Sequence, residues 1–135
     1  MNEKQLQSLY TKWIREQIEL GKMETFVYEL KIKPRGKRLN FKSDLRPQQI
    51  PSLLQTKHSC LSHKISDFSM MDSKPFDGFV VCREPAYLVV CWYEPRKPKI
   101  LYHLDPDIIN DMIKSGKKSI SEDEANIIKD FYKII

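Results

Sequence analysis

The residues best suited to chemistry lie in an alternating segment near the start of the chain. Residues 26–33 read Phe-Val-Tyr-Glu-Leu-Lys-Ile-Lys, and β-branched and aromatic residues at alternate positions predict a strand. Side chains two residues apart share one face of a strand, so Glu29 and Lys31 point the same way. A carboxylate holds hard divalent cations, and an ammonium group beside it can orient water or stabilise charge on a phosphate. The pair indicates metal-dependent hydrolysis of a phosphodiester.

Asp77 is the carboxylate that we pair with Glu29. It lies near the start of an apolar segment, residues 76–82, which predicts another strand. A carboxylate held beside a core needs a cation, a backbone cap or a metal ion as its partner. Its position is consistent with a metal ligand and equally with a cap of the Pro- and Gly-containing turn. Asp67, at the end of a predicted strand over residues 63–68, has the same two interpretations.

Cations cluster directly after the strand that carries Glu29. Residues 33–38 read Lys-Pro-Arg-Gly-Lys-Arg, a turn built on Pro and Gly, and a further lysine follows at 42. Such a turn can follow a phosphate backbone, although a solvated loop tip explains the same charges equally well. The residues assigned to nucleic-acid binding are Lys33, Arg35, Lys37, Arg38, Lys42, Lys64 and Lys74.

Length and composition predict one globular domain. A chain of 135 residues can bury a core, and 41% hydrophobic with 30% charged residues is ordinary for a soluble protein. The net charge of +5 favours a polyanionic partner. Cys60, Cys82 and Cys91 are odd in number and show no repeated spacing, so we expect reduced thiols in a cytoplasmic protein. Neither a membrane-spanning segment nor a signal peptide is predicted.

The remaining elements must position these residues. Apolar spacings of three and four predict a helix over residues 3–20 that ends at Gly21. A helix from about Pro47 to about Lys57, capped by Ser43 or Asp44, carries Gln49. The neighbouring His58, Cys60 and His63 lack a second ligand pair, so we interpret them as a connecting loop rather than a zinc site.

The second half of the chain predicts mainly strands and then helices. Strands are expected at about 76–82, 86–93 and 99–104, and the almost wholly apolar segment 86–93 should be central. A helix over 105–116 and a final helix from the capping box at Ser121 to the C-terminus complete the chain. We therefore predict an α/β or α+β domain with a mixed central sheet, in which residues 1–104 form the core and 105–135 the C-terminal helices.

Taken in order, these motifs resemble the PD-(D/E)XK nuclease superfamily. Within it the chain is most similar to Holliday-junction resolvases of the RecU type and their phage-encoded relatives, over roughly residues 5–104. The segments that carry the resemblance are Tyr28-Glu29-Leu30-Lys31, Gln49-Ile50 with Leu53, Lys64-Ile65-Ser66-Asp67, Lys74-Pro75-Phe76-Asp77 and Ala86-Tyr87-Leu88-Val89-Val90.

The resemblance implies a restriction-endonuclease-like core, a Mg2+ or Mn2+ ion, and cleavage of branched or structured DNA in phage or bacterial recombination. Transferred residue by residue, it makes Glu29 a metal ligand and Lys31 the catalytic lysine. Gln49 matches the glutamine that family members carry on the following helix, and Asp77, or Asp67, is the remaining acidic ligand. A homodimer is expected if the substrate is a symmetrical junction.

The order of the acidic residues departs from the family pattern. The metal-binding Asp usually precedes the acid-x-Lys strand, whereas here the first helix leads almost directly to Glu29. Asp77 or Asp67 would then enter the site from a later strand, with Glu16 of the first helix as a further oxygen donor. Otherwise the site is incomplete and the chain binds DNA without cutting it. In a third hypothesis, a protein-interaction domain carries Glu29 and Lys31 as an ordinary surface ion pair.

Overall fold

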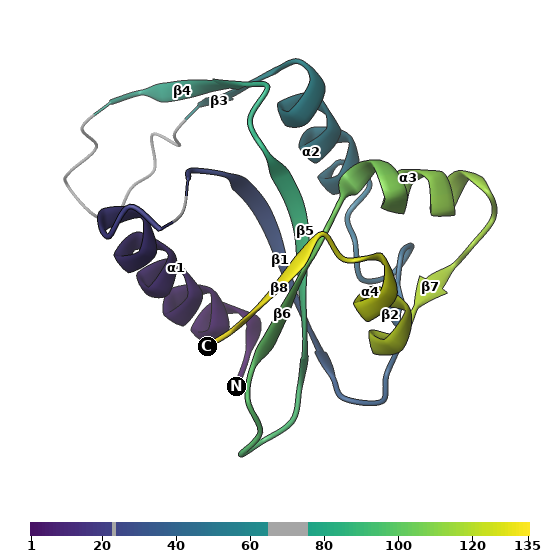
Figure 1. Cartoon of the computed structure of the whole chain (residues 1–135). Helices are drawn as coiled ribbons and strands as arrows, with labels where there is room; N and C mark the ends of the chain where they lie inside the picture. Colours follow the sequence, from purple (N-terminus) through teal and green to yellow (C-terminus); the bar gives the residue numbers. More distant parts are fainter. Residues whose placement is uncertain (23, 65–75) are drawn as a thin grey trace.

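A four-stranded mixed sheet with the order β1-β5-β6-β8 runs through the middle of the protein (Figure 1). β1 (Val27–Pro34) is parallel to β5 (Ala86–Tyr93), and β6 (Ile100–Leu104) and β8 (Phe131–Ile134) follow in antiparallel pairing. The computed structural model describes residues 1–22, 24–64 and 76–135. The predicted mixed sheet flanked by helices is confirmed.

Helices cover both faces of the sheet (Figure 1). Helix α1 (Glu3–Glu19) packs on one face, and α2 (Gln49–His58), α3 (Pro106–Lys114) and α4 (Glu122–Ile128) pack on the other. Two short ribbons complete the fold: β2 (Leu39–Asn40) pairs with β7 (Ser119–Ile120), and β3 (Cys60–Lys64) pairs with β4 (Gly78–Cys82).

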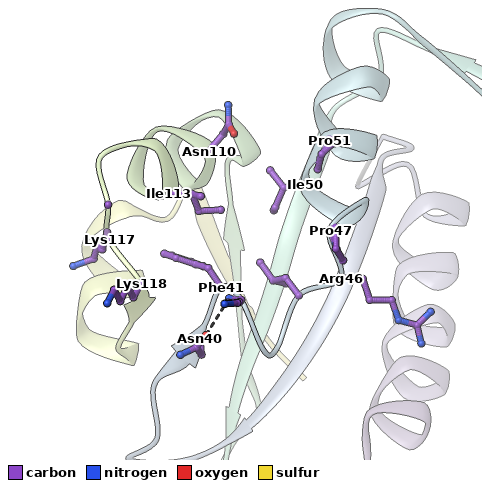
Figure 2. A pocket seen from close by; sticks show the side chains of 13 residues that line it. Asn40, Phe41, Arg46, Pro47, Ile50, Pro51, Asn110, Ile113, Lys117 and Lys118 are labelled. Atoms are coloured by element: carbon purple, nitrogen blue, oxygen red, sulfur yellow. Dashed lines mark hydrogen bonds between the residues drawn. The ribbon is translucent and has the colours of Figure 1, made fainter.

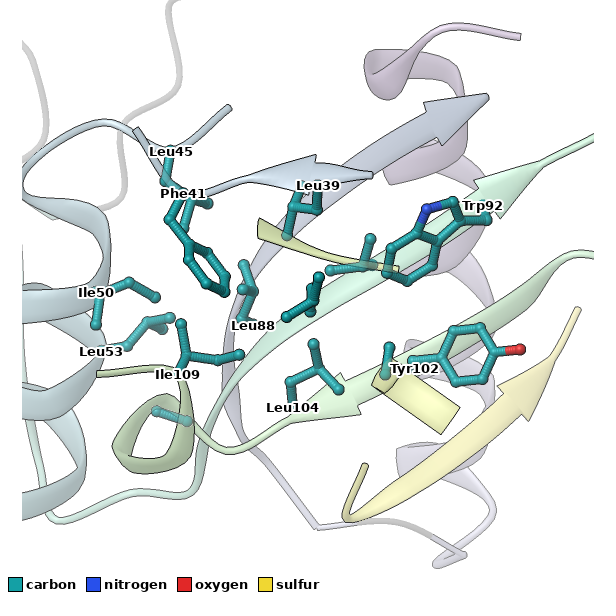
Figure 3. Packing of buried hydrophobic residues seen from close by; sticks show 14 residues of the cluster. Leu39, Phe41, Leu45, Ile50, Leu53, Leu88, Trp92, Tyr102, Leu104 and Ile109 are labelled. Carbon is teal, nitrogen blue, oxygen red and sulfur yellow. The ribbon is translucent and has the colours of Figure 1, made fainter. Parts of the chain in front are cut away.

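The alternation of side chains along β5 divides the core into two clusters. Leu88, Val90 and Trp92 join the larger cluster, which α2, α3 and α4 cover (Figure 3). Val89 and Cys91 join the smaller cluster beneath α1. All five side chains are at most 1% exposed, so β5 is the central strand that its apolar sequence predicts.

The C-terminal helix is shorter than the sequence predicts. α4 ends at Ile128, and residues 131–134 form β8 on the edge of the sheet, so the prediction of a helix to the C-terminus is wrong there. Burial alternates along β8, with Tyr132 and Ile134 about half exposed. Pairing with β6 gives these residues backbone hydrogen bonds to a distant strand, and this long-range pairing outweighs the local helical pattern.

The start of α2 also differs from the expected capping. The helix begins at Gln49, so Pro51 falls in the first turn, where its missing N–H costs no helical hydrogen bond. Asp44 does not cap this helix. Its Oδ2 accepts a hydrogen bond from the backbone N–H of Asn40 at 2.7 Å and closes the loop between β2 and α2.

Two of the three cysteines form a disulfide, which corrects the expectation of reduced thiols. Cys60 and Cys82 lie directly opposite one another on β3 and β4 and are bonded, whereas Cys91 is free and buried. Cys60 thus begins a strand rather than sitting in a connecting loop. A separation of 22 residues gives no visible motif, because the strand register alone brings the two together. Among the described residues, no helix is long and apolar enough to span a membrane.

Thiol titration tests this pairing. In the unfolded chain without reductant we expect one reactive thiol, that of Cys91, and after reduction all three. The protein is purified without reductant, unfolded in denaturant and titrated with a chromogenic disulfide. The same titration after reduction and removal of the reductant gives the second number of thiols. Three reactive thiols before reduction would show that Cys60 and Cys82 are not bonded.

A buried histidine ties α1 to the sheet. His103 of β6 is 0% exposed and its Nδ1–H donates to the carbonyl of Leu101 at 3.1 Å. Because Nδ1 carries the hydrogen, Nε2 accepts, and its donor is the hydroxyl of Tyr10 on α1. The ring stacks on Phe131 with centroids 4.0 Å apart. Burial lowers the pKa of His103 from 6.5 to about 4.

This histidine makes stability depend on pH. In the unfolded chain His103 binds a proton near pH 6.5, whereas in the folded chain it does so only near pH 4. Protonation therefore favours the unfolded chain as the pH falls, and the neutral His103 contributes its full stabilisation of the fold above pH 6.5. We expect the free energy of unfolding to fall by about 3 kcal/mol as pH decreases across that window. Urea unfolding at several pH values measures it. His103→Gln should flatten the dependence and the exposed His63→Gln should keep it; the reverse pattern would contradict the assignment.

Candidate functional site

Glu29 and Lys31 form an ion pair on the edge strand of the sheet. Both side chains project from β1 toward the face covered by α2, as their spacing predicts, and Lys31 Nζ lies 3.2 Å from Glu29 Oε1. The side chain of Lys31 is 13% exposed and that of Glu29 30% exposed. The pair is therefore half-buried at the rim of the core and is not an ordinary solvated surface pair.

Gln49 completes a three-residue network, which we call the Glu29 cluster (Glu29, Lys31 and Gln49). The amide Nε2 of Gln49 donates to Glu29 Oε1 at 2.6 Å. The amide Oε1 accepts from the backbone N–H of Arg46 at 2.9 Å. Because one end of the amide is held by a donor, the other end must present its hydrogens to the carboxylate. The sequence motifs named all three residues, and the structure brings them together.

The packing of α2 explains why Gln49 reaches β1. Leu53, one turn after Gln49, is 4% exposed and packs in the larger cluster against Leu88 and Val90 of β5. Residues four apart share a helix face, so Gln49 faces the sheet with Leu53. In the parallel register Glu29 lies beside Leu88 and Lys31 beside Val90. The apolar contacts of α2 with β5 therefore position its first residue over the charges of β1.

A small hollow of about 120 Å³ adjoins the cluster between β1, α2 and the start of β3. Glu29, Gln49, Ser52 and Thr56 contribute polar groups to its lining, and Leu61 of β3 closes one side. A space of this size accepts water molecules or an ion but no nucleobase.

Asp44 is a further carboxylate near the face of β1 that carries Glu29, and its sequence position indicates only a helix cap. Lys33 follows Lys31 on the same face of β1, and its Nζ lies 3.0 Å from Asp44 Oδ2. The side chain of Asp44 is 23% exposed. Nothing in the local sequence marks this contact, because it depends on the fold of the loop between β2 and α2.

The second acidic ligand is not found where we expected it. Asp77 is exposed immediately before β4, so the expectation that it lies beside the core is wrong. Leu61, which borders the hollow, pairs with Val81. Asp77 lies four residues from Val81, or roughly 13 Å along the strand.

Asp67 and Lys74 lie outside the described residues. Glu16 is exposed on α1, which covers the opposite face. The described residues contain no group of three or more His, Cys, Asp or Glu arranged for a metal ion.

The predicted cationic turn is largely neutralised by acidic residues. Arg35 pairs with Glu94 at 3.0 Å and with Glu122 at 3.5 Å, and Arg38 pairs with Glu124 at 2.7 Å. Hydrogen bonds from Lys117 and Arg38 lower the pKa of Glu124 to about 2. Of the other residues assigned to nucleic-acid binding, Lys33 is paired with Asp44, and Lys37, Lys42 and Lys64 are exposed.

No protein-family model, curated protein or solved structure matches the chain. The function must therefore be argued from the site itself and from the motifs that the site brings together.

The hydrogen bond of Gln49 can be tested through stability. Gln49→Ala removes a donor to a half-buried carboxylate, so we expect the free energy of unfolding to fall by about 1–2 kcal/mol. Gln48→Ala is the matched control, because Gln48 is exposed and makes no side-chain capping bond, and it should change stability by less than about 0.5 kcal/mol. Urea unfolding of the two variants beside the wild type gives the comparison. Equal effects would show that Gln49 does not hold Glu29.

Proposed function

We propose that the protein is a metal-dependent endonuclease that hydrolyses phosphodiester bonds in branched or structured DNA. The observation that carries this proposal is the Glu29 cluster. The ammonium nitrogen of Lys31 and the amide nitrogen of Gln49 both lie within 3.2 Å of the same carboxylate oxygen, Oε1 of Glu29. These are three of the four residues that the resemblance assigns to catalysis, and Asp77 is the fourth. The order α1, β1, α2 and β5, with β1 and β5 parallel, supports a restriction-endonuclease-like core.

The donor set fits a Mg2+ or Mn2+ ion only if other oxygens share it. Glu29 would hold the ion, and among the described contacts its Oε1 is used by Lys31 and Gln49 while Oε2 accepts no hydrogen bond. Mg2+ is commonly bound by one or two carboxylates together with waters and substrate phosphate oxygens. When bound, such an ion would acidify a water molecule and offset phosphate charge.

The residues of the cluster would act on the phosphate and on the attacking water. Lys31 has three N–H donors, of which one faces Glu29, so two can stabilise charge on a phosphate oxygen. Gln49 has a second amide hydrogen that can orient the water. The backbone N–H of Arg46 fixes this amide by donating to its Oε1. Glu29 keeps both donors in place. A homodimer would suit a symmetrical junction.

A second candidate is a module of the same fold that binds DNA without cutting it. The observation that favours it is the position of Asp77, which is exposed before β4 and lies roughly 13 Å of strand from the hollow beside Glu29. One carboxylate is a weak anchor for a hard cation. In this case the Glu29 cluster would serve as a polar contact for a phosphate.

Cleavage of a labelled four-way junction distinguishes the two candidates. The wild type is incubated with Mg2+ or Mn2+ beside linear duplex, and Glu29→Gln, Lys31→Met and Gln49→Ala are compared with it. We expect the Glu29 and Lys31 variants to lose at least about 100-fold in rate, in line with removal of a transition-state contact. The exposed Glu19→Gln is the control for an acidic change away from the site. Asp77→Asn and Asp44→Asn show which further carboxylate takes part.

Each result separates the possibilities. Cutting by the wild type with loss in the cluster variants supports the nuclease. Retarded migration of the junction in a gel, without cutting in either metal, supports the binding module. If the wild type neither cuts nor binds the junction, both candidates are excluded.

A further inference from the structure

A second and larger hollow lies on the other side of the N-terminus of α2. Its volume is about 650 Å³, and it separates the loop between β2 and α2 from the end of α3 and the loop that follows. Figure 2 shows Phe41, Ile50 and Ile113 pointing into the same space, with Lys117 and Lys118 on the α3 side. Pockets that hold small organic ligands commonly have volumes of about 300–1,000 Å³.

The floor of this hollow is the outer surface of the larger core cluster. Phe41 is 8% exposed and Leu45 and Ile50 are each 5% exposed, so these side chains are fixed by their packing. Ile113 of α3 stands at the side and is 38% exposed. An apolar ligand surface placed here would meet apolar groups that packing holds in place.

The rim of the hollow is cationic for a local structural reason. α3 ends in a Schellman motif, in which the N–H of Lys117 bonds to the carbonyl of Met112 and Gly116 has a φ of +92°. This turn directs the chain across the hollow, where the N–H of Phe41 bonds to the carbonyl of Lys118 at 3.0 Å. Lys42, in the loop between β2 and α2, also lines the hollow. Among the described residues, Lys42 and Lys118 form no ion pair, whereas Lys117 pairs with Glu124.

Consecutive residues of α2 border the Glu29 cluster and this hollow. Gln49 faces Glu29 on one side of α2, and Ile50 forms part of the hollow on the other. Arg46 fixes the amide of Gln49 through its backbone N–H, and Figure 2 shows its side chain extending away from the hollow.

We propose that this hollow binds a nucleotide, with the nucleobase between the floor of Phe41 and Ile50 and the side chain of Ile113, and with the phosphate on Lys42 and Lys118. The ligand must combine an apolar, flat body with negative charge, because the floor offers no charged group and the rim carries Lys42 and Lys118, which form no ion pair within the part of the chain that the structure describes. A nucleotide has both parts. It is either a free mononucleotide or an unpaired nucleotide within a DNA strand, and binding requires no cleavage at the Glu29 cluster.

Calorimetric titration of the whole chain tests the proposal and separates the two sources. The probes are dTMP, a single-stranded dT8, a duplex of the same length, and inorganic phosphate as the base-free control. We expect dTMP to bind and phosphate alone to bind at least tenfold more weakly. Binding of dT8 at least tenfold tighter than dTMP and than the duplex identifies a nucleotide within a strand, whereas equal binding of dT8 and dTMP identifies a free nucleotide. Both results support the site.

Matched variants locate the binding in the hollow. Ile113→Glu places a carboxylate at the side of the hollow and should weaken dTMP binding at least tenfold. Ile108→Glu should leave binding unchanged, because Ile108 has similar exposure on the same helix (36%) but does not line the hollow. Lys118→Glu should weaken binding and the exposed Lys114→Glu should not. Circular dichroism confirms folding of each variant. Binding of phosphate as tight as that of dTMP, equal effects of Ile113→Glu and Ile108→Glu, or no binding of dTMP and dT8 would overturn the proposal.

Discussion

The parallel pairing of β1 with β5 determines where each candidate functional side chain points. Eight consecutive residues are in register, and parallel strands require a long crossover between them. That crossover contains α2 and the β3–β4 ribbon, and α2 packs on β5 through Leu53. The face of β1 that carries Glu29 and Lys31 therefore meets the first turn of α2. A different pairing of β1 would separate Glu29 from Gln49.

Short-range patterns predicted those parts of the molecule that short-range physics decides. The two-residue period placed Glu29 and Lys31 on one face, and the apolar run at 86–93 identified the central strand. Motif order named Gln49, although no local pattern could show that its amide reaches Glu29. The disulfide, the contact of Asp44 with Lys33, and β8 were missed because each depends on pairing between distant segments. The register of β3 with β4 places Cys60 opposite Cys82, and residues 131–134 form a strand because they pair with the edge of β6.

Counting charges along the chain overstated how much positive charge is available to a ligand. Arg35 and Arg38 belong to the turn that predicts phosphate binding, and both are paired with glutamates from the C-terminal half of the chain. Such partly exposed pairs contribute little stability, but they reduce the local potential. Cations without such partners among the described residues, including Lys42 and Lys118, border the apolar hollow beside α2 instead. The partner of a basic protein is thus better inferred from the cations that remain unpaired after folding than from the net charge.

The Glu29 cluster is poorly explained as a device for stability. Half-buried charges lose hydration, and apolar side chains at the same positions would pack against α2 with equal or greater stabilisation. Here the Oε2 of Glu29, the second amide hydrogen of Gln49 and two hydrogens of Lys31 have no partner among the described residues, although the cluster is held rigidly by Arg46 and by the packing of α2. Polar groups that are held in place at the rim of a core, with donors and acceptors open to solvent, can meet developing charge on a phosphate without first reorganising, and the proposed role depends on this property.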